Sequence, residues 1–161
     1  MRKLLRHSFI AAATLSSVIL APAAVSHFDD KEPLQSARQS YFALVAMNFG
    51  PIGAMIKGEA PWDEAKLKRY AEDLDNLGEL DVLRFFAEGS DKGTTRAKPE
   101  IWSNMDDFSD KFAALGKAAD QLEDVVEDSA GDRKAVAQAF GEVGKACKAC
   151  HDDYKSKNYL Y

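Results

Sequence analysis

The feature that most constrains the fold is a run of apolar residues spaced alternately four and three positions apart in the C-terminal half of the chain. These residues are Ile101, Met105, Phe108, Phe112, Leu115, Ala119, Leu122 and Val126. A second run repeats the spacing with Val136, Phe140, Val143, Cys147, Cys150 and Tyr154. Because side chains three and four positions apart share one helix face, each run predicts a long amphipathic helix that packs against partner helices.

The N-terminal half predicts two more amphipathic helices, of which the first is expected from about Pro33 to Lys57. Gly58 should end this helix, and the Gly50-Pro51 pair inside it should kink or break it. Its inward-facing residues are Leu34, Tyr41, Phe42, Val45, Phe49, Ile52 and Ile56. The helix is therefore expected to present one apolar face to the core.

The second helix is expected to begin after Asp63, a residue type that caps helix N-termini. Its inward face carries Leu67, Tyr70, Leu74 and Leu77. A polar loop over residues 89–98 precedes the third helix, which should start at Pro99, and Asp132 should cap the fourth. No stretch shows a convincing strand alternation. The predicted fold class is all-α, an antiparallel four-helix bundle with helices about 20° off parallel and room inside for a cofactor.

Residues 1–26 have the pattern of a secretory signal peptide. Three basic residues precede the apolar run 9–20, and small residues follow it, so cleavage is expected near residues 23–26. A membrane anchor is the alternative, but serines, a threonine and a proline interrupt the uncharged stretch, which fits a continuous apolar span poorly. The remaining residues, 27–161, suit a single domain.

Charge limits the partners of the mature protein. Removing the signal takes away three of the 21 basic residues and none of the 26 acidic ones, which leaves a formal net charge of −8. This charge argues against nucleic acid as a partner, because phosphate neutralisation needs clustered Lys and Arg. No membrane contact is expected after cleavage, and export would place the chain in an oxidising compartment.

The last expected helix carries Cys147-Lys148-Ala149-Cys150-His151, which matches C-x-x-C-H, the attachment signature of haem c. On a helix the two cysteines and the histidine share one face. Two thiols can therefore reach the vinyl groups of one haem while the imidazole meets its iron. We predict one covalent haem c bonded through Cys147 and Cys150, with His151 as the axial iron ligand.

Two other interpretations of this motif agree less well with its surroundings. A redox disulfide usually begins a helix that follows a strand, whereas this pair lies deep in the last helix of a chain without strands. A structural zinc site needs four ligands, and only three candidates occur here.

The sixth position of the iron has few candidate ligands. His7 leaves with the signal peptide, and His27 lies at or beside the new N-terminus. Methionine is an alternative, since Met47, Met55 and Met105 survive processing and a His/Met pair would give a low-spin electron carrier. Methionine, however, occurs more often as a core residue of helices than as an iron ligand.

Several motifs make the chain resemble one family. They are Arg38-Gln39-Ser40 in the first helix, residues 57–63 between the first two helices (KGEAPWD), residues 98–102 opening the third (KPEIW), and the C-terminal C-x-x-C-H. With the order of elements, they resemble cytochrome c′, the class II c-type cytochromes, over essentially the whole mature chain. The resemblance implies a periplasmic four-helix bundle of a Gram-negative bacterium, and a homodimer packed through its first two helices. It also implies five-coordinate, high-spin haem that binds nitric oxide.

The resemblance also assigns roles to individual residues. Phe42 stands where low-spin relatives have a ligating methionine, so the iron should be five-coordinate with this ring over its vacant face. Arg38 is expected beside a haem propionate, and Lys155 on the proximal side next to His151. Four more residues are expected to touch the haem: Gln39, Phe86, Thr95 and Arg96.

These expectations favour a cytochrome that captures nitric oxide, with electron transfer to an unknown redox partner as a compatible second role. The alternative is a six-coordinate, low-spin carrier with a methionine ligand. An enzyme is not expected, because Phe42 supplies no acid or base over the iron. Since a large apolar ring must move and offers no hydrogen bond, nitric oxide should bind, carbon monoxide should bind weakly or slowly, and oxygen should not bind stably.

Overall fold

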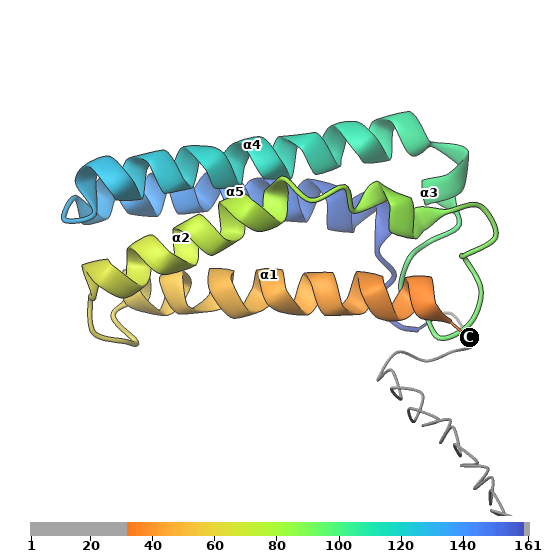
Figure 1. Ribbon diagram of the computed structural model, residues 1–161, viewed down its shortest axis with the longest axis horizontal. Helices are drawn as coiled ribbons and strands as arrows, with labels where there is room; N and C mark the ends of the chain where they lie inside the picture. Colours follow the sequence, from red (N-terminus) through yellow and green to blue (C-terminus); the bar gives the residue numbers. More distant parts are fainter. Residues whose placement is uncertain (1–31, 160–161) are drawn as a thin grey trace, which may run out of the picture.

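The computed structural model describes residues 32–159 as a bundle of four long helices (Figure 1). These are α1 (Pro33–Lys57), α2 (Glu64–Gly78), α4 (Met105–Ser129) and α5 (Arg133–Tyr154). The short helix α3 (Glu100–Ser103) and the 3-10 turn η1 (Leu83–Phe86) lie at the end of the bundle where α1 begins and α5 ends. The predicted all-α bundle is confirmed. The predicted signal peptide, residues 1–26, lies outside the described residues.

Three predicted helix boundaries are confirmed by capping interactions in the structure. The carboxylate of Asp63 accepts from the backbone N–H of Lys66 at 3.0 Å at the start of α2. The carboxylate of Asp132 likewise accepts from the second and third N–H groups of α5. Gly58 ends α1 in the left-handed conformation, with φ 76°, which a residue without Cβ adopts at little cost.

Of the kink or break expected at Gly50-Pro51, the break does not occur: α1 continues through Pro51 to Lys57. A proline inside a helix removes one backbone hydrogen bond and crowds the preceding turn. Ile52, Gly53 and Met55 follow directly and are buried against the other helices. Tertiary packing of this last stretch therefore holds the helix together across the proline.

The expectation of one continuous third helix from Pro99 is wrong. The chain leaves the helical conformation at Asn104, with φ −136° and ψ 46°, and this separates α3 from α4. The Ser103 hydroxyl and the Asn104 amide both donate to the carbonyl of Glu100, at 3.2 and 3.1 Å. Such local side-chain bonds compete with the helical pattern and favour a break.

The core divides into two clusters along the bundle. One fills the middle and the α1–α2 loop end, with Ile52, Leu67, Leu122, Val126, Val136 and Val143 among its most buried residues. The other is largely aromatic and lies toward the end carrying η1 and α3; it contains Tyr41, Val82, Phe86, Ile101, Phe108, Phe112 and Tyr154. Within residues 32–159, none of the helices is both long enough and apolar enough to cross a membrane.

Candidate cofactor site

A largely apolar cavity of about 640 Å³ lies beside the aromatic cluster, with walls from α1, α4, α5 and the loop before α3. Small-molecule and cofactor sites commonly measure roughly 300–1,000 Å³. All ten site residues predicted from the sequence line this one cavity: Arg38, Gln39, Phe42, Phe86, Thr95, Arg96, Cys147, Cys150, His151 and Lys155. Folding thus brings together residues from distant parts of the chain.

Cys147 and Cys150 lie one turn apart on α5, and both are free thiols. Burial raises the pKa of the Cys147 thiol, and it raises the pKa of the Cys150 thiol to about 11. Cysteines that act in thiol exchange have a lowered pKa, so the redox interpretation finds no support in this environment. Two neutral thiols on one wall of an apolar cavity suit thioether attachment.

His151 lines the same wall, one residue beyond Cys150. Partial burial lowers the pKa of its imidazole, and the positive charges of Lys155 and Arg96 lower it further. The neutral ring, which is the form that ligates metal ions, is therefore favoured at neutral pH.

The loop before α3 holds the end of α5 in place. Ala97 and Lys155 form an isolated antiparallel bridge. The Nζ of Lys98 donates to the carbonyls of Asp152 and Asp153, at 3.2 and 2.8 Å, and so satisfies acceptors that a helix end leaves free. These bonds fix the last turn of α5, which carries the histidine.

Arg96 and Thr95 serve the same junction. The Nε and Nη2 of Arg96 donate to the carbonyls of Ser156 and Lys157, each at 2.8 Å. Thr95 is buried, and its Oγ1 accepts from the backbone N–H of Ala97 at 3.1 Å. Both residues line the cavity while their polar groups hold the loop to the segment after α5.

Phe42 lies on the α1 wall, where two neighbouring rings hold it. Its centroid is 5.1 Å from that of Tyr41 and 6.3 Å from that of Phe112, both in edge-on geometry. Edge-on pairs are favourable beyond their buried area. The position that the resemblance assigns to a ligating methionine in low-spin relatives is thus filled by a packed apolar ring.

The three methionines considered as iron ligands do not line the cavity. Met47 is 69% exposed, and Met55 is buried in the core cluster of the bundle middle. Met105 packs against the aromatic cluster. In this conformation none of them supplies sulfur to the cavity.

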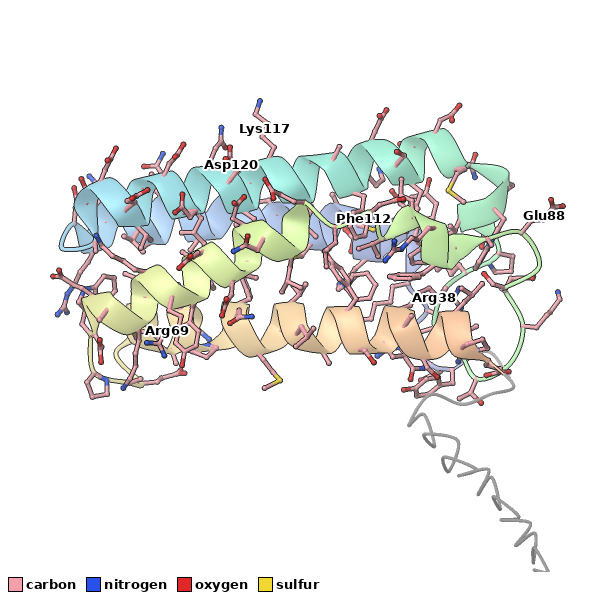
Figure 2. All side chains as sticks on the ribbon, in the orientation of Figure 1. Arg38, Arg69, Glu88, Phe112, Lys117 and Asp120 are labelled. Atoms are coloured by element: carbon pink, nitrogen blue, oxygen red, sulfur yellow. The ribbon has the colours of Figure 1, made fainter. Side chains whose placement is uncertain are left out.

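Arg38 is buried and points from α1 toward η1 and the chain that follows it (Figure 2). Its Nη1 donates to the carbonyl of Phe85 and to Oγ of Ser90, at 2.8 and 2.9 Å, and its Nη2 donates to the carbonyl of Ser90 at 2.8 Å. The guanidinium also lies over the Phe86 ring, 5.1 Å from its centroid. Arg38 therefore ties the segment around η1 to the start of α1 while it lines the cavity.

Other lining residues are absent from the predicted site, among them Gln35, Phe108, Lys111, Phe112 and Tyr154. The regular apolar spacing already predicts that the three aromatic residues face inward. Their position beside the C-x-x-C-H motif could therefore have been inferred. Nothing in the sequence marks Gln35 or Lys111, because polar residues on amphipathic helices are mostly solvated.

The residues present fit an iron porphyrin with vinyl groups. The cavity is apolar, two neutral thiols lie one turn apart on its wall, and a neutral imidazole follows them. Within residues 32–159 no group of three or more His, Cys, Asp or Glu side chains is arranged to hold a metal ion directly, which leaves the zinc alternative without a ligand set. Fold and site together define a helical-bundle c-type cytochrome.

Comparison with known proteins agrees with this class. A sequence model of the family described as Cytochrome C′ matches residues 34–155, so the chain belongs to the cytochrome c′ family. Its cofactor is haem c, as predicted. A cytochrome c′ of Cereibacter sphaeroides is 39% identical over 146 residues, which cover 89% of this chain and 96% of the relative.

Two similar solved structures bear on ligand binding and assembly in this family. One is a nitric oxide complex of a mutant cytochrome c prime from Alcaligenes xylosoxidans, with TM-score 0.70 and 38% identity over 81% of this chain and 99% of that one. The other is a cytochrome c′ with a ligand-controlled dimer dissociation, with TM-score 0.72 and 31% identity over 78% of this chain and 96% of that one.

Proposed function

We propose that this protein is an exported cytochrome c′ whose single haem, attached through Cys147 and Cys150, is held by His151 and captures nitric oxide at an open sixth position. The haem supplies an iron atom that can bind a diatomic gas and change oxidation state. The chain supplies the covalent anchors, the axial imidazole and an apolar wall that excludes water and competing ligands.

The observation that carries the proposal is the packed ring of Phe42 on the α1 wall. Phenylalanine donates no lone pair to iron, and the three methionines of the mature chain do not line the cavity. These two observations argue against an axial pair of His and Met and support five-coordinate iron. The nitric oxide complex of the Alcaligenes protein supports the choice of gas.

Phe42 also supports discrimination among gases. Its ring must move away before a ligand can approach, and it offers no hydrogen bond to a bound polar diatomic. Oxygen, which gains most from such a bond, should not bind stably, and carbon monoxide should bind weakly or slowly.

Spectroscopy of the mature holoprotein tests this function. We expect a reduced protein with a broad high-spin visible spectrum and five-coordinate marker bands in resonance Raman, both of which change when nitric oxide is added. A sharp low-spin α-band without nitric oxide would mean a six-coordinate carrier instead. Saturation by micromolar carbon monoxide would contradict the predicted discrimination.

Electron transfer is a compatible second function. The cavity wall includes Tyr159, which is 60% exposed, and the exposed Lys155, so one side of the cofactor would lie near solvent. Reversible one-electron oxidation by a soluble redox partner would support this role. The partner itself is not specified by the site.

A homodimer through α1 and α2 is also part of the proposal. The outer face of α1 exposes Leu44 by 49% and Met47 by 69%, and Leu80, just beyond α2, is 51% exposed. Leu44 and Met47 are three positions apart and share one face of α1, and an exposed apolar patch favours association. The neighbour with ligand-controlled dimer dissociation supports a dimeric state.

A further inference from the structure

Gln35 lines the cofactor cavity and carries a buried polar atom without a partner. The residue lines the cavity and is only 6% exposed. Among the buried side-chain oxygen and nitrogen atoms of the described residues, only its Oε1 has no hydrogen-bond partner. Buried polar atoms are nearly always hydrogen-bonded, and leaving one unpaired is costly. An orphaned amide at a ligand cavity therefore points to a partner on the ligand.

The position of Gln35 along α1 indicates which part of the haem it meets. Phe49 of α1 stacks on Phe140 of α5 with ring centroids 4.1 Å apart, and Gly53, one turn further along α1, also faces Phe140. Phe49 lies near Gly144 as well, so α1 and α5 run in opposite directions. The start of α1 therefore lies beside the end of α5. Gln35 precedes Phe42 by seven residues, or about 10 Å along the helix.

The covalent anchors orient the porphyrin with respect to this position. Cys147 and Cys150 line the cavity from α5, whereas Gln35 lines it from α1. In haem the two vinyl groups and the two propionates lie on opposite edges. Attachment of the vinyl edge at Cys147 and Cys150, which lie along α5, therefore directs the propionates away from α5 and toward the opposite walls, which include α1.

Neighbouring donors on this wall are already engaged. The Nη1 of Arg38 donates to the Phe85 carbonyl and to Oγ of Ser90, and its Nη2 donates to the Ser90 carbonyl. The Nε2 of Gln39 reaches the carbonyl of Thr94 at 3.5 Å. Rotation about the last side-chain bond of Gln35 exchanges its amide oxygen and nitrogen, which places two N–H donors where the unpaired oxygen lies.

We propose that Gln35 donates a hydrogen bond from Nε2 to a haem propionate and acts as a positioning residue that stabilises the ionised carboxylate. The proposal rests on the proposed function, because it requires the attached haem. Arg38, Arg96, Lys111 and Lys155 also line the cavity and contribute positive charge. These groups are present in both the wild type and a Gln35 variant. A difference between the two proteins therefore reports the effect of the Gln35 amide alone.

The experiment measures the midpoint reduction potential of the holoprotein against pH. The inflection caused by propionate ionisation should move about one pH unit upward in Gln35→Leu, because a hydrogen bond to the charged form lowers the pKa of a carboxyl by about this amount. Gln121→Leu, which removes an exposed amide from α4, should leave the profile unchanged. Identical profiles for Gln35→Leu and wild type would overturn the proposal.

A crystal structure of the wild-type holoprotein gives an independent answer if the variant fails to fold. A distance of about 2.7–3.2 Å between the Gln35 amide nitrogen and a propionate oxygen supports the proposal. A longer separation, or a water molecule between the two groups, overturns it. A wild type without bound haem would instead contradict the proposed function, so the two failures are distinguishable.

Discussion

Phe42 shows how one side chain limits what the cavity can admit. Its ring is held edge-on by Tyr41 and Phe112, so displacement disturbs two aromatic contacts as well as its own position. Every incoming ligand must displace the ring at the same cost in free energy. Only a ligand that forms a strong bond to iron can offset this cost.

Phe42→Ala should raise the affinity for carbon monoxide by about tenfold or more, which corresponds to removal of roughly 1.4 kcal/mol of unfavourable displacement. Nitric oxide should still bind. Optical titration of the reduced protein measures both. Phe85→Ala is the control, since Phe85 is partly buried but does not line the cavity. An unchanged carbon monoxide affinity in Phe42→Ala would show that the ring is not the barrier.

Tyr154 and Asp107 form a second informative pair. The Tyr154 hydroxyl donates to Oδ2 of Asp107, and this bond raises the pKa of Tyr154 to about 12. The same bond, followed by that from Lys111, lowers the pKa of Asp107. Because the pKa of Asp107 is lower in the folded state, its ionised carboxylate stabilises the fold at pH values above the unfolded pKa, which is near 4. This contribution is lost as the pH falls below that value. The raised phenol pKa stabilises it below pH 10, and this contribution is lost between about pH 10 and 12.

Tyr154→Phe should therefore be less stable than wild type at neutral pH, with a difference that shrinks below about pH 4 and above about pH 10. Urea unfolding followed by circular dichroism at acidic, neutral and alkaline pH measures this. Tyr70→Phe in α2, away from the pair, should show no such pH-dependent difference. A difference that stayed constant across the whole range would mean that the hydroxyl acts through packing alone.

At the scale of elements, α2 and α4 approach each other through two glycines. A Cβ added at Gly78 would lie 3.0 Å from the Cα of Gly116, and one added at Gly116 would lie 3.2 Å from the carbonyl oxygen of Gly78. Backbone atoms cannot move aside as flexible side chains do. The glycines therefore set the distance between the two helices, next to the buried Ala119.

Gly78→Ala should reduce the free energy of unfolding by about 1–3 kcal/mol, because the methyl group forces α2 and α4 apart. Gly141→Ala is a matched control in α5, where an added Cβ meets no atom within 4 Å. This second change should stabilise the protein by about 0.5–1 kcal/mol through helix propensity. Denaturant unfolding measures both, and equal effects of the two substitutions would contradict the close approach.

At the scale of the whole molecule, cofactor and fold depend on each other. The cavity of about 640 Å³ lies between parts of α1, α4 and α5, where the haem should lie. An apolar cavity of this size leaves its lining side chains without packing partners.

Apoprotein made by Cys147→Ser with Cys150→Ser should unfold at least about 10 °C below the holoprotein, since a ligand bound to the native state alone stabilises it. Thermal unfolding followed by circular dichroism measures the shift. Equal midpoints would show that the bundle packs independently of its cofactor.

The predicted dimer is tested on the exposed face of α1. Met47→Glu should shift the protein toward monomers, because the new charge would be buried in the interface at high cost. Sedimentation equilibrium measures the change. Gln121→Glu on α4 adds the same charge elsewhere and should leave the association unchanged. Insensitivity to Met47→Glu would exclude this face as the contact.

Much of this molecule is encoded locally. The spacing of apolar residues predicts the four long helices, and Asp63, Gly58 and Asp132 mark ends that the structure confirms, since capping depends only on nearby residues. The C-x-x-C-H motif likewise places three functional groups on one helix face, because helical periodicity alone decides which side chains share a face.

Other features depend on which surfaces meet in space, and only the tertiary structure decided them. The continuity of α1 through Pro51 depends on the burial of the residues after it, and the hydrogen bonds of Arg38 depend on a segment about 50 positions away. The unpaired amide of Gln35 reflects a cavity whose walls come from distant parts of the chain. Local sequence determines helix formation and the order of groups along it, whereas burial and long-range contacts arise only when the helices pack together.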